Sequence, residues 1–126
     1  MSEKIVFLDT NTLLFPLRYK LNITEAIKIE LGSETKIMVP DFVVNELERL
    51  YYLRKDPKYS FALQLAKHIG IFKTKIKTTS QVDDALISLC LQKNAYLVTL
   101  DKKLLRKAIK KGIKTLQLKG KKAFKE

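Results

Sequence analysis

Short apolar runs alternate along the chain with longer stretches in which apolar residues recur every three or four positions. A continuous apolar run of roughly four to eight residues is typical of a strand that is buried on both faces of a sheet. Residues 71–77 alternate irregularly and fit either a strand or an extended loop. Strands are therefore predicted at residues 5–8, 36–39, 96–100 and 113–118.

Helices are predicted between these strands from the same spacing and from residues that start or end helices. Thr24 is a candidate N-cap for a helix that Gly32 ends. Pro16 is expected to limit the segment after Asn11 to a short helical turn. Further helices are predicted at residues 42–55, with Pro40 and Asp41 at the start, and at about 58–69, 83–94 and 102–111.

Strands that alternate with helices indicate an α/β fold with a mainly parallel sheet covered on both faces. The chain of 126 residues is long enough for one domain with a single core. We expect this domain to cover residues 1–118. Residues 119–126 contain few apolar side chains, so they are predicted to form a basic, mobile C-terminal tail.

The net charge of +12 is concentrated near the C-terminus. Residues 1–101 carry a balance of +2, whereas residues 102–126 carry +10. Such a block is typical of a surface that binds a phosphate backbone, although a solubilising surface would explain the same charge. The candidate nucleic-acid-binding residues are Lys102, Lys103, Arg106, Lys107, Lys110, Lys111, Lys119, Lys121, Lys122 and Lys125.

Several functional classes are disfavoured by composition. No apolar run approaches the roughly 18 residues of a membrane span, and the N-terminal residues lead into a strand without the features of a signal peptide. Cys90 lies in an apolar helical stretch and is expected to be a small buried residue. With His68 as the single histidine, disulfide frameworks, Cys/His zinc sites and histidine-dependent triads are poor interpretations. A cytoplasmic location fits this composition.

Four acidic residues stand where predicted strands meet helices: Asp9, Glu46, Asp84 and Asp101. In open α/β sheets, ligands bind outside the carboxyl ends of the strands, so these side chains can converge on one crevice. Carboxylates at close range repel one another unless a divalent cation lies among them. Oxygen ligands of this kind favour Mg²⁺ or Mn²⁺. The crevice and the basic C-terminal end are expected on different surfaces because their charges are separated along the chain.

Each acid also has an alternative interpretation or a competing neighbour. Asp9 and Asp101 would each make an ordinary N-cap for the helix that follows. Glu46 is preferred to Glu48 because its neighbours at helical spacing are mainly apolar.

Asp83 and Asp84 are adjacent, so on a helix they point about 100° apart. Ser80 and Asp83 have the spacing of a capping box, which favours Asp83 as a cap or outer-sphere partner and Asp84 as the metal ligand.

The stretches VFLDTNTLL, VPDFVVNELERL, DDALISLCLQKNAYLVTLDKKLLRKA and IKTLQL follow one another over nearly the whole chain. In this order they resemble PIN-domain nucleases. The resemblance implies a three-layer α/β/α sandwich around a central, mainly parallel sheet. It also implies an endonuclease that acts mostly on single-stranded RNA with one or two Mg²⁺ or Mn²⁺ ions. By position, Asp9, Glu46, Asp84 and Asp101 match the family's acidic quartet, and Asn11 and Thr99 match its polar companions; Asp83 makes the third position ambiguous.

Cations held by such a quartet would bind the scissile phosphate and activate a water molecule for in-line attack, so neither histidine nor lysine is needed as a general base. The Lys/Arg-rich end is similar to PIN proteins that process small-subunit ribosomal RNA in archaea and eukaryotes. Toxins of VapBC-type toxin–antitoxin pairs share the core and form the alternative. The expected partners are single-stranded RNA, including pre-ribosomal RNA, together with a ribosome-assembly protein, an antitoxin or a second copy of the chain.

Two interpretations from other classes remain. A receiver-like phosphoacceptor also places aspartates around Mg²⁺, but it usually has an acidic pair after the first strand, where this chain has Asp9 alone. A catalytically silent RNA-binding module could keep the basic end, and a metal titration would distinguish it. Neighbouring genes would separate toxin from processing enzyme: a small antitoxin frame upstream favours the first, and ribosome genes favour the second.

Overall fold

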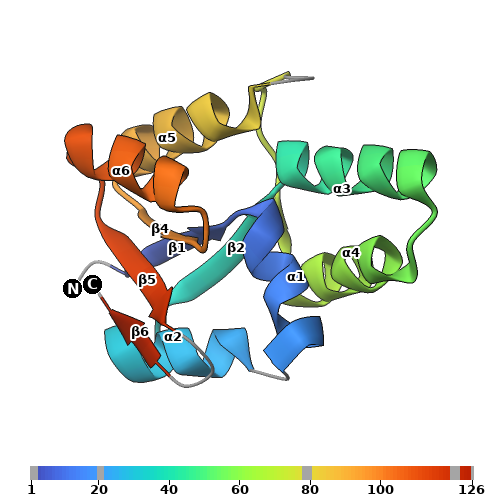
Figure 1. Ribbon diagram of the computed structural model, residues 1–126. Coiled ribbons are helices and arrows are strands. Elements are labelled where there is room, and N and C mark those ends of the chain that lie inside the picture. Colours follow the sequence, from blue (N-terminus) through green and yellow to red (C-terminus); the bar gives the residue numbers. More distant parts are fainter. Residues whose placement is uncertain (1–2, 20–21, 78–80, 120–122, 126) are drawn as a thin grey trace.

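The computed structural model describes residues 3–19, 22–77, 81–119 and 123–125 (Figure 1). In these ranges one sheet has the strand order β3-β2-β1-β4-β5-β6. Strands β1 to β5 are parallel, and β6 runs antiparallel to β5. The strands are β1 (Ile5–Leu8), β2 (Lys36–Pro40), β3 (Ile71–Phe72), β4 (Tyr96–Thr99), β5 (Thr115–Lys119) and β6 (Ala123–Lys125).

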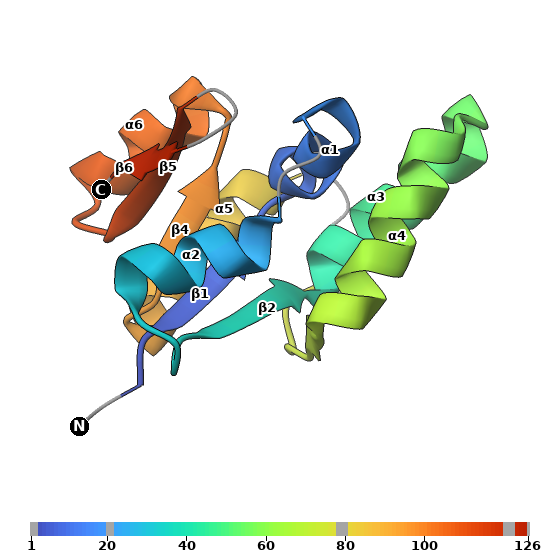
Figure 2. The same cartoon turned by 90° about the horizontal axis from the view of Figure 1, so that it is seen from below.

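Helices cover both faces of this sheet, as the sequence predicted. Figures 1 and 2 show α5 and α6 over one face and α2 over the other, while α3 and α4 form a pair beside β2 and β3. The fold is therefore an α/β sandwich with a parallel central sheet. The helices are α1 (Thr10–Tyr19), α2 (Ile23–Leu31), α3 (Asp41–Arg54), α4 (Pro57–Ile69), α5 (Val82–Lys93) and α6 (Lys102–Lys110).

The central strands are buried on both faces. Val6, Phe7 and Leu8 of β1 are fully buried, and so are Leu97 and Val98 of the neighbouring β4. A strand covered by helices on both sides needs apolar residues at every position, which explains the unbroken apolar run of β1. The strand predictions at residues 5–8, 36–39, 96–100 and 113–118 are confirmed within one or two residues.

Two local predictions were wrong. The segment after Asn11 is a continuous helix, α1, which runs through Pro16 instead of ending near it. Proline removes one backbone donor, and packing of α1 against α3, α4 and β4, with Leu13 fully buried, stabilises the helix despite the missing donor. The N-cap of α2 is Asn22, whose side chain accepts a hydrogen bond from the backbone N of Glu25, not Thr24.

The C-terminal end contains a strand that was not predicted. Ala123–Lys125 pair with β5, Gln117 being aligned with Lys125. Residues 120–122 and 126 lie outside the described residues, and the mobility of the basic tail in solution stays a prediction. No helix in the described part of the chain is long and apolar enough to cross a membrane.

The sheet register brings distant residues together at one edge. Strands β1 and β4 are parallel, with Leu8 aligned to Val98. Because both strands leave the sheet on the same side, Asp9 and Thr99 come next to each other at their carboxyl ends. This edge is where ligands bind in open α/β sheets.

Candidate functional site

Asp9 is the most buried acid of the site, with 4% of its surface exposed. Its Oδ1 accepts a hydrogen bond from the backbone N of Thr12 at 3.0 Å, and the Thr12 hydroxyl lies 2.5 Å from the same atom. Its Oδ2 accepts a 2.5 Å hydrogen bond from the Thr99 hydroxyl. Burial raises the pKa of Asp9 to about 6, although these hydrogen bonds oppose the rise; the nearby Asp101 charge adds to it.

The position of Asp9 is compatible with both roles that the sequence left open. Its bond from the backbone N of Thr12, three residues on, is an N-terminal cap of the kind expected at the start of α1. Its carboxylate also lines the cavity described below. Thr12 was missed by sequence reasoning. The Asp-x-x-Thr spacing was the available signal, since a capping aspartate bonds to the residue three positions on.

Glu46 comes from the second turn of α3 and is half-buried. One of its carboxylate oxygens, Oε1, accepts a hydrogen bond from the Thr10 hydroxyl at the start of α1. Glu48, two residues later, is exposed and does not line the cavity. The structure thus brings Glu46 to the site, as the apolar neighbours of that residue indicated.

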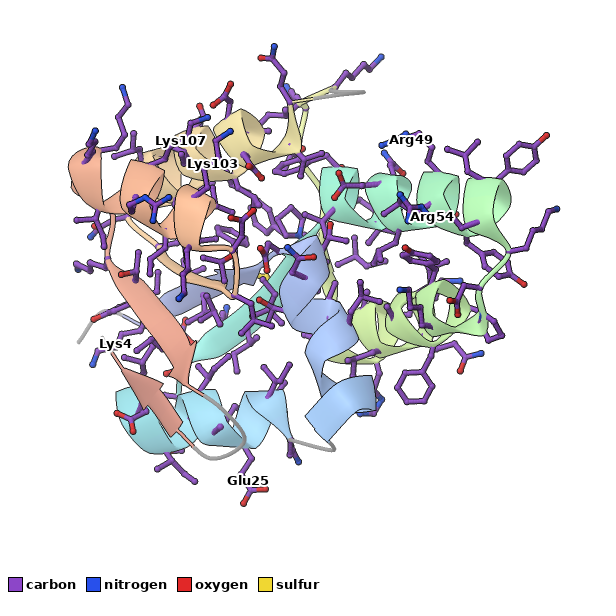
Figure 3. All side chains as sticks on the ribbon, in the orientation of Figure 1. Lys4, Glu25, Arg49, Arg54, Lys103 and Lys107 are labelled. Carbon is purple, nitrogen blue, oxygen red and sulfur yellow. The ribbon has the colours of Figure 1, made fainter. Side chains whose placement is uncertain are left out.

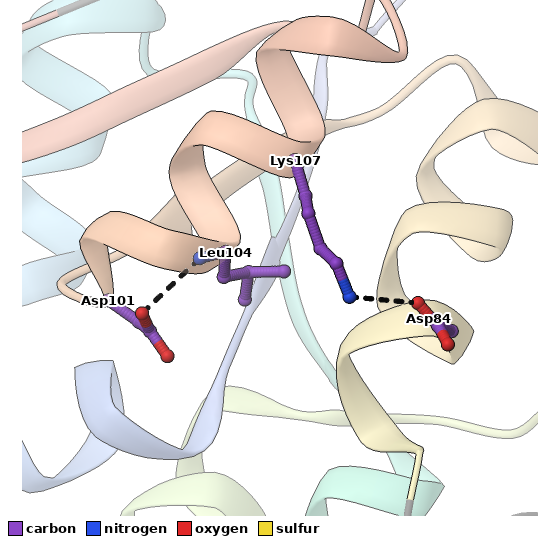
Figure 4. A network of polar contacts seen from close by, with 4 residues as sticks. All are labelled: Asp84, Asp101, Leu104 and Lys107. Carbon is purple, nitrogen blue, oxygen red and sulfur yellow. Dashed lines mark hydrogen bonds and ion pairs between the residues drawn. The ribbon is translucent and has the colours of Figure 1, made fainter.

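Asp101 is the N-cap of α6, which was the alternative interpretation for this residue. Its Oδ1 accepts a hydrogen bond from the backbone N of Lys103 at 2.9 Å. The same oxygen accepts one from the backbone N of Leu104 at 3.2 Å, which Figure 4 shows. The backbone N of Asp101 itself donates to the Thr99 hydroxyl at 3.0 Å. Capping and a position in the cavity are compatible, because Asp101 also lines it.

The structure reverses the predicted placement of the aspartate doublet. Asp83 is half-buried and lines the cavity, whereas Asp84 is exposed and lies outside it. The carboxylate of Asp84 forms an ion pair with Lys107, its Oδ1 lying 3.4 Å from the lysine Nζ (Figure 4). The physical reason is the rotation of α5, whose packing against β1, β4, α3 and α6 turns Asp83 toward the cavity and Asp84 toward α6. Gln81 is the N-cap of this helix, so Asp83 is the second helical residue and not the third that a capping box requires. Ser80, the predicted cap, lies outside the described residues.

Burial raises the pKa of Asp83, and the charges of Asp101 and Glu46 raise it further, whereas Lys107 lowers it. These charges act on Asp83 because the acidic side chains line the same cavity, which has a volume of about 230 Å³. It is lined by Asp9, Thr10, Asn11, Glu46, Leu50, Val82, Asp83, Leu86 and Asp101. A larger cavity of about 460 Å³, between α2, β2 and α4, has no carboxylate in its lining.

The donor set of the smaller cavity fits a hard divalent cation. Its charged groups are carboxylates, which Mg²⁺ and Mn²⁺ prefer. In the described part of the chain no three Asp, Glu, His or Cys side chains are arranged so that they could together hold a metal ion. That is compatible with Mg²⁺, which usually keeps several waters and takes one or two carboxylates together with substrate phosphates.

Cys90 is buried, as predicted, and burial raises the pKa of its thiol to about 12. A thiol of this kind is not ionised near neutral pH and makes a poor nucleophile. His68 lines the larger cavity, away from the carboxylates. The side chains available for chemistry at the site are therefore oxygen ligands.

The basic helix begins at the acidic cavity, so the prediction that acid and base lie on different surfaces was wrong for α6. This helix follows its cap Asp101 directly, and Lys107 reaches the Asp84 carboxylate. Separation along the sequence did not predict separation in space, because β4 returns the chain to the same edge of the sheet. The described candidates Lys102, Lys103, Arg106, Lys107, Lys110 and Lys111 are exposed. The structure does not describe the side chains of the remaining candidates, Lys119, Lys121, Lys122 and Lys125.

Comparison with known proteins places this chain in a family. The sequence model described as "PIN like domain" matches residues 6–121. Ribonuclease VapC4 of Methanocaldococcus jannaschii is 29% identical over 120 residues, which cover 92% of this chain and 91% of that protein. The rRNA-processing protein FCF1 of Saccharomyces cerevisiae is 30% identical over 118 residues, which cover 91% of this chain but only 60% of the yeast protein.

Solved structures show the same relationship. The PIN domain endonuclease Utp24 superimposes with a TM-score of 0.78 at 29% identity, covering 96% of this chain and 89% of that one. A domain of a functionally unknown protein from Methanocaldococcus jannaschii has a TM-score of 0.72 at 20% identity, with 93% and 92% covered, and supports the fold alone. With the family's sequence model matching all but the two ends of the chain, the protein belongs to the PIN-domain family of nucleases.

Proposed function

We propose that the protein is a divalent-metal-dependent endoribonuclease that hydrolyses phosphodiester bonds in single-stranded RNA. The observation that carries the proposal is the convergence of four carboxylates from four different segments on one cavity at the carboxyl edge of the sheet. These carboxylates belong to Asp9, Glu46, Asp83 and Asp101. Membership of the PIN-domain family supports the same chemistry.

The same four residues would hold one or two Mg²⁺ or Mn²⁺ ions, with one or two carboxylates binding each ion directly and the others acting through water. Asp83 takes the place that the sequence assigned to Asp84, because Asp83 faces the cavity and Asp84 pairs with Lys107. When bound, the metal supplies positive charge for the scissile phosphate and an activated water molecule.

The remaining residues of the site keep the carboxylates in place. Thr12 and Thr99 fix both oxygens of Asp9, and Thr10 fixes Glu46. Preorganised carboxylates need not rearrange when a cation binds, which keeps the reacting groups in a defined geometry. Asn11 is exposed at the cavity and can donate a side-chain hydrogen bond to a phosphate oxygen.

For the biological role we propose ribosomal RNA processing, with a ribosome-assembly protein as partner and a cytoplasmic location. The similarity to FCF1 and the basic C-terminal end support this role. A ribonuclease toxin held by an antitoxin is the second candidate. It is supported by the similarity to Ribonuclease VapC4, which extends over 120 residues at 29% identity.

The metal requirement is tested by melting temperature and cleavage. Mg²⁺ or Mn²⁺ should raise the melting temperature of the native protein by mass action, and cleavage of single-stranded RNA should require one of these ions. Glu46→Gln should reduce both effects. Glu48→Gln, on the same helix but outside the cavity, is the matched control and should behave as wild type. Cleavage that persists in excess EDTA would contradict the proposal.

The silent RNA-binding alternative predicts a different pattern, in which RNA binds but no strand is cut at any metal concentration. The two biological roles separate by substrate. A processing enzyme should cut a pre-ribosomal RNA fragment at one position, and a toxin should be silenced by the product of an adjacent small gene. Mapping the cleaved ends of the pre-ribosomal RNA fragment tests the first role, and adding the neighbouring gene product to the cleavage reaction tests the second.

A further inference from the structure

Helix α3 leads from the acidic cavity to an exposed surface. Glu46 and Leu50 both line the cavity. Arg49 lies between them in sequence and one turn after Glu46, so Arg49 and Glu46 are neighbours on the helix surface, although Arg49 itself does not line the cavity. Arg49 is exposed, and Figure 3 draws it on the side of α3 away from α4.

Positively charged side chains also lie on α6, the helix that begins at the cavity residue Asp101. The backbone of Lys103 donates to Asp101, a cavity residue. Lys107, one turn later, reaches Asp84, the neighbour of Asp83. Figure 3 shows Lys103 and Lys107 on α6 and Arg49 on α3. Each of these helices also carries a cavity acid, Glu46 on α3 and Asp101 at the cap of α6, so cations accompany the carboxylates on two separate helices.

An exposed aromatic ring follows Arg49 along α3. Tyr52 is 73% exposed and stands one turn beyond Arg49, on an adjacent part of the helix surface. The Nζ of Lys55 lies 5.3 Å from the centroid of its ring. Exposed aromatic rings beside cations are the stacking platforms that single-stranded nucleic acids use.

We propose that the substrate strand crosses the cavity from α6 to α3, with a phosphate flanking the scissile one bound by Arg49 and a base beyond it stacked on Tyr52. This inference rests on the proposed function and adds a defined path to it. Phosphate contacts of this kind hold the strand in register without reading its sequence. The stacking is also tolerant of sequence, because every base presents a π-face.

Charge favours RNA over a second copy of this chain as the occupant of this surface. Beyond the cavity, the charged residues of the proposed path on α3 and at its cap are Arg49 and Lys55, which lies over the Tyr52 ring, and both are positive. A two-fold dimer would place the same patch on both sides of the contact, bringing these like charges together. A polyanion is complementary to them.

Binding of a labelled oligouridylate, measured in EDTA so that no strand is cut, tests the path. Arg49→Ala and Tyr52→Ala are compared with two controls. Arg54→Ala removes the same charge from the same helix, but on the side where Figure 3 draws it between α3 and α4. Tyr52→Phe keeps the ring.

Arg49→Ala should lower the salt slope by about 0.7 on a log–log plot, so that its deficit in affinity relative to wild type is roughly fivefold larger at 0.1 M than at 1 M salt. Tyr52→Ala should weaken binding by roughly fivefold or more with the slope unchanged. Arg54→Ala and Tyr52→Phe should bind as wild type. Both test variants should keep the metal-induced rise in melting temperature, which shows that the carboxylates are intact.

Two results for the variants would overturn this inference alone. One is that wild type binds the oligonucleotide and Arg49→Ala binds it with the same slope as Arg54→Ala. The other is that Tyr52→Ala changes the sedimentation mass and not RNA binding, since the surface would then be a protein interface. If wild-type protein neither binds single-stranded RNA in EDTA nor cleaves it with Mg²⁺ or Mn²⁺, the proposed function itself fails. If it cleaves RNA with metal but does not bind it in EDTA, the path is wrong and the proposed function stands.

Discussion

The hydroxyl of Thr99 at the end of β4 donates a 2.5 Å hydrogen bond to Oδ2 of Asp9 at the end of β1, across ninety residues of sequence. The same hydroxyl accepts a hydrogen bond from the backbone N of Asp101. Because a hydroxyl can donate and accept at once, Thr99 links two of the four cavity acids. It is itself only 1% exposed, so its position is set by the core.

Replacing Thr99 with valine should impair the site and the fold together. The change keeps the shape of the side chain but leaves Asp9 Oδ2 without its donor in a buried place. We expect a decrease of about 1–3 kcal/mol in the free energy of unfolding and weaker binding of Mg²⁺, because Asp9 is less firmly oriented. Chemical denaturation and a metal titration measure the two effects.

The control for this variant is Thr35→Val. Thr35 is also buried and donates to the carbonyl of Gly32, far along the chain from the cavity residues. The Thr35→Val variant should lose stability without a change in metal affinity. Thr99→Ser should restore both properties, since it returns the hydroxyl. Equal metal affinities of Thr99→Val and wild type would show that Thr99 serves the fold only.

Asp9→Asn should stabilise the protein at neutral pH in EDTA. The pKa of Asp9 is raised from 3.8 to about 6 in the folded state, so folding takes up a proton between these values. Wild-type stability should therefore fall as pH rises from about 4 to about 6. The variant cannot ionise there, and at pH 7 it should be more stable by on the order of 1–3 kcal/mol.

The stability difference should shrink as the pH falls from about 6 toward 4 and should vanish well below the unfolded-state pKa of 3.8, where the wild-type carboxyl is protonated in both states. With Mg²⁺ present the stability difference between Asp9→Asn and wild type should narrow or change sign, because wild type then gains binding energy that the variant lacks. Cleavage should be abolished in the variant. Denaturation curves at several pH values measure the effect, and a pH-independent difference would contradict the assigned cause.

The aspartate doublet should separate by function. Asp83→Asn should weaken the metal-induced rise in melting temperature and reduce cleavage, because Asp83 faces the cavity. Asp84→Asn should leave both nearly unchanged, since it removes only an exposed ion pair worth about 0–1 kcal/mol. The reverse pattern, with Asp84→Asn losing metal binding, would restore the assignment made from sequence.

The C-terminal lysines should contribute affinity without specificity. Replacing Lys119, Lys121, Lys122 and Lys125 with glutamine removes charge while keeping the backbone that pairs β6 with β5. RNA binding should weaken, and the log–log salt slope should fall by about 0.7 for each phosphate that these lysines no longer neutralise. An unchanged slope, measured by titration at several salt concentrations, would indicate that this end solubilises the chain or meets a protein partner.

The sequence alone determined the alternation of strands and helices in the central sheet and the presence of an acidic cluster at its edge. Unbroken apolar runs such as residues 5–8 can only be satisfied in a sheet covered on both faces, and that requirement is local. The position of Asp9 and Asp101 at strand ends also follows from local pattern. Parallel strands then deliver these acids to one edge, so the existence of an acidic site could be predicted.

Only the tertiary structure decided which side chains face the cavity. Asp83 and Asp84 carry the same carboxyl group, and the choice between them depends on how α5 is rotated about its axis. Packing of α5 against β1, β4, α3 and α6 sets that rotation and so turns Asp83 toward the cavity. The Thr99 bond to Asp9 depends in the same way on the register of β4 against β1. Register and helix rotation are fixed by contacts between distant residues, and a local pattern of apolar and polar positions carries no record of them.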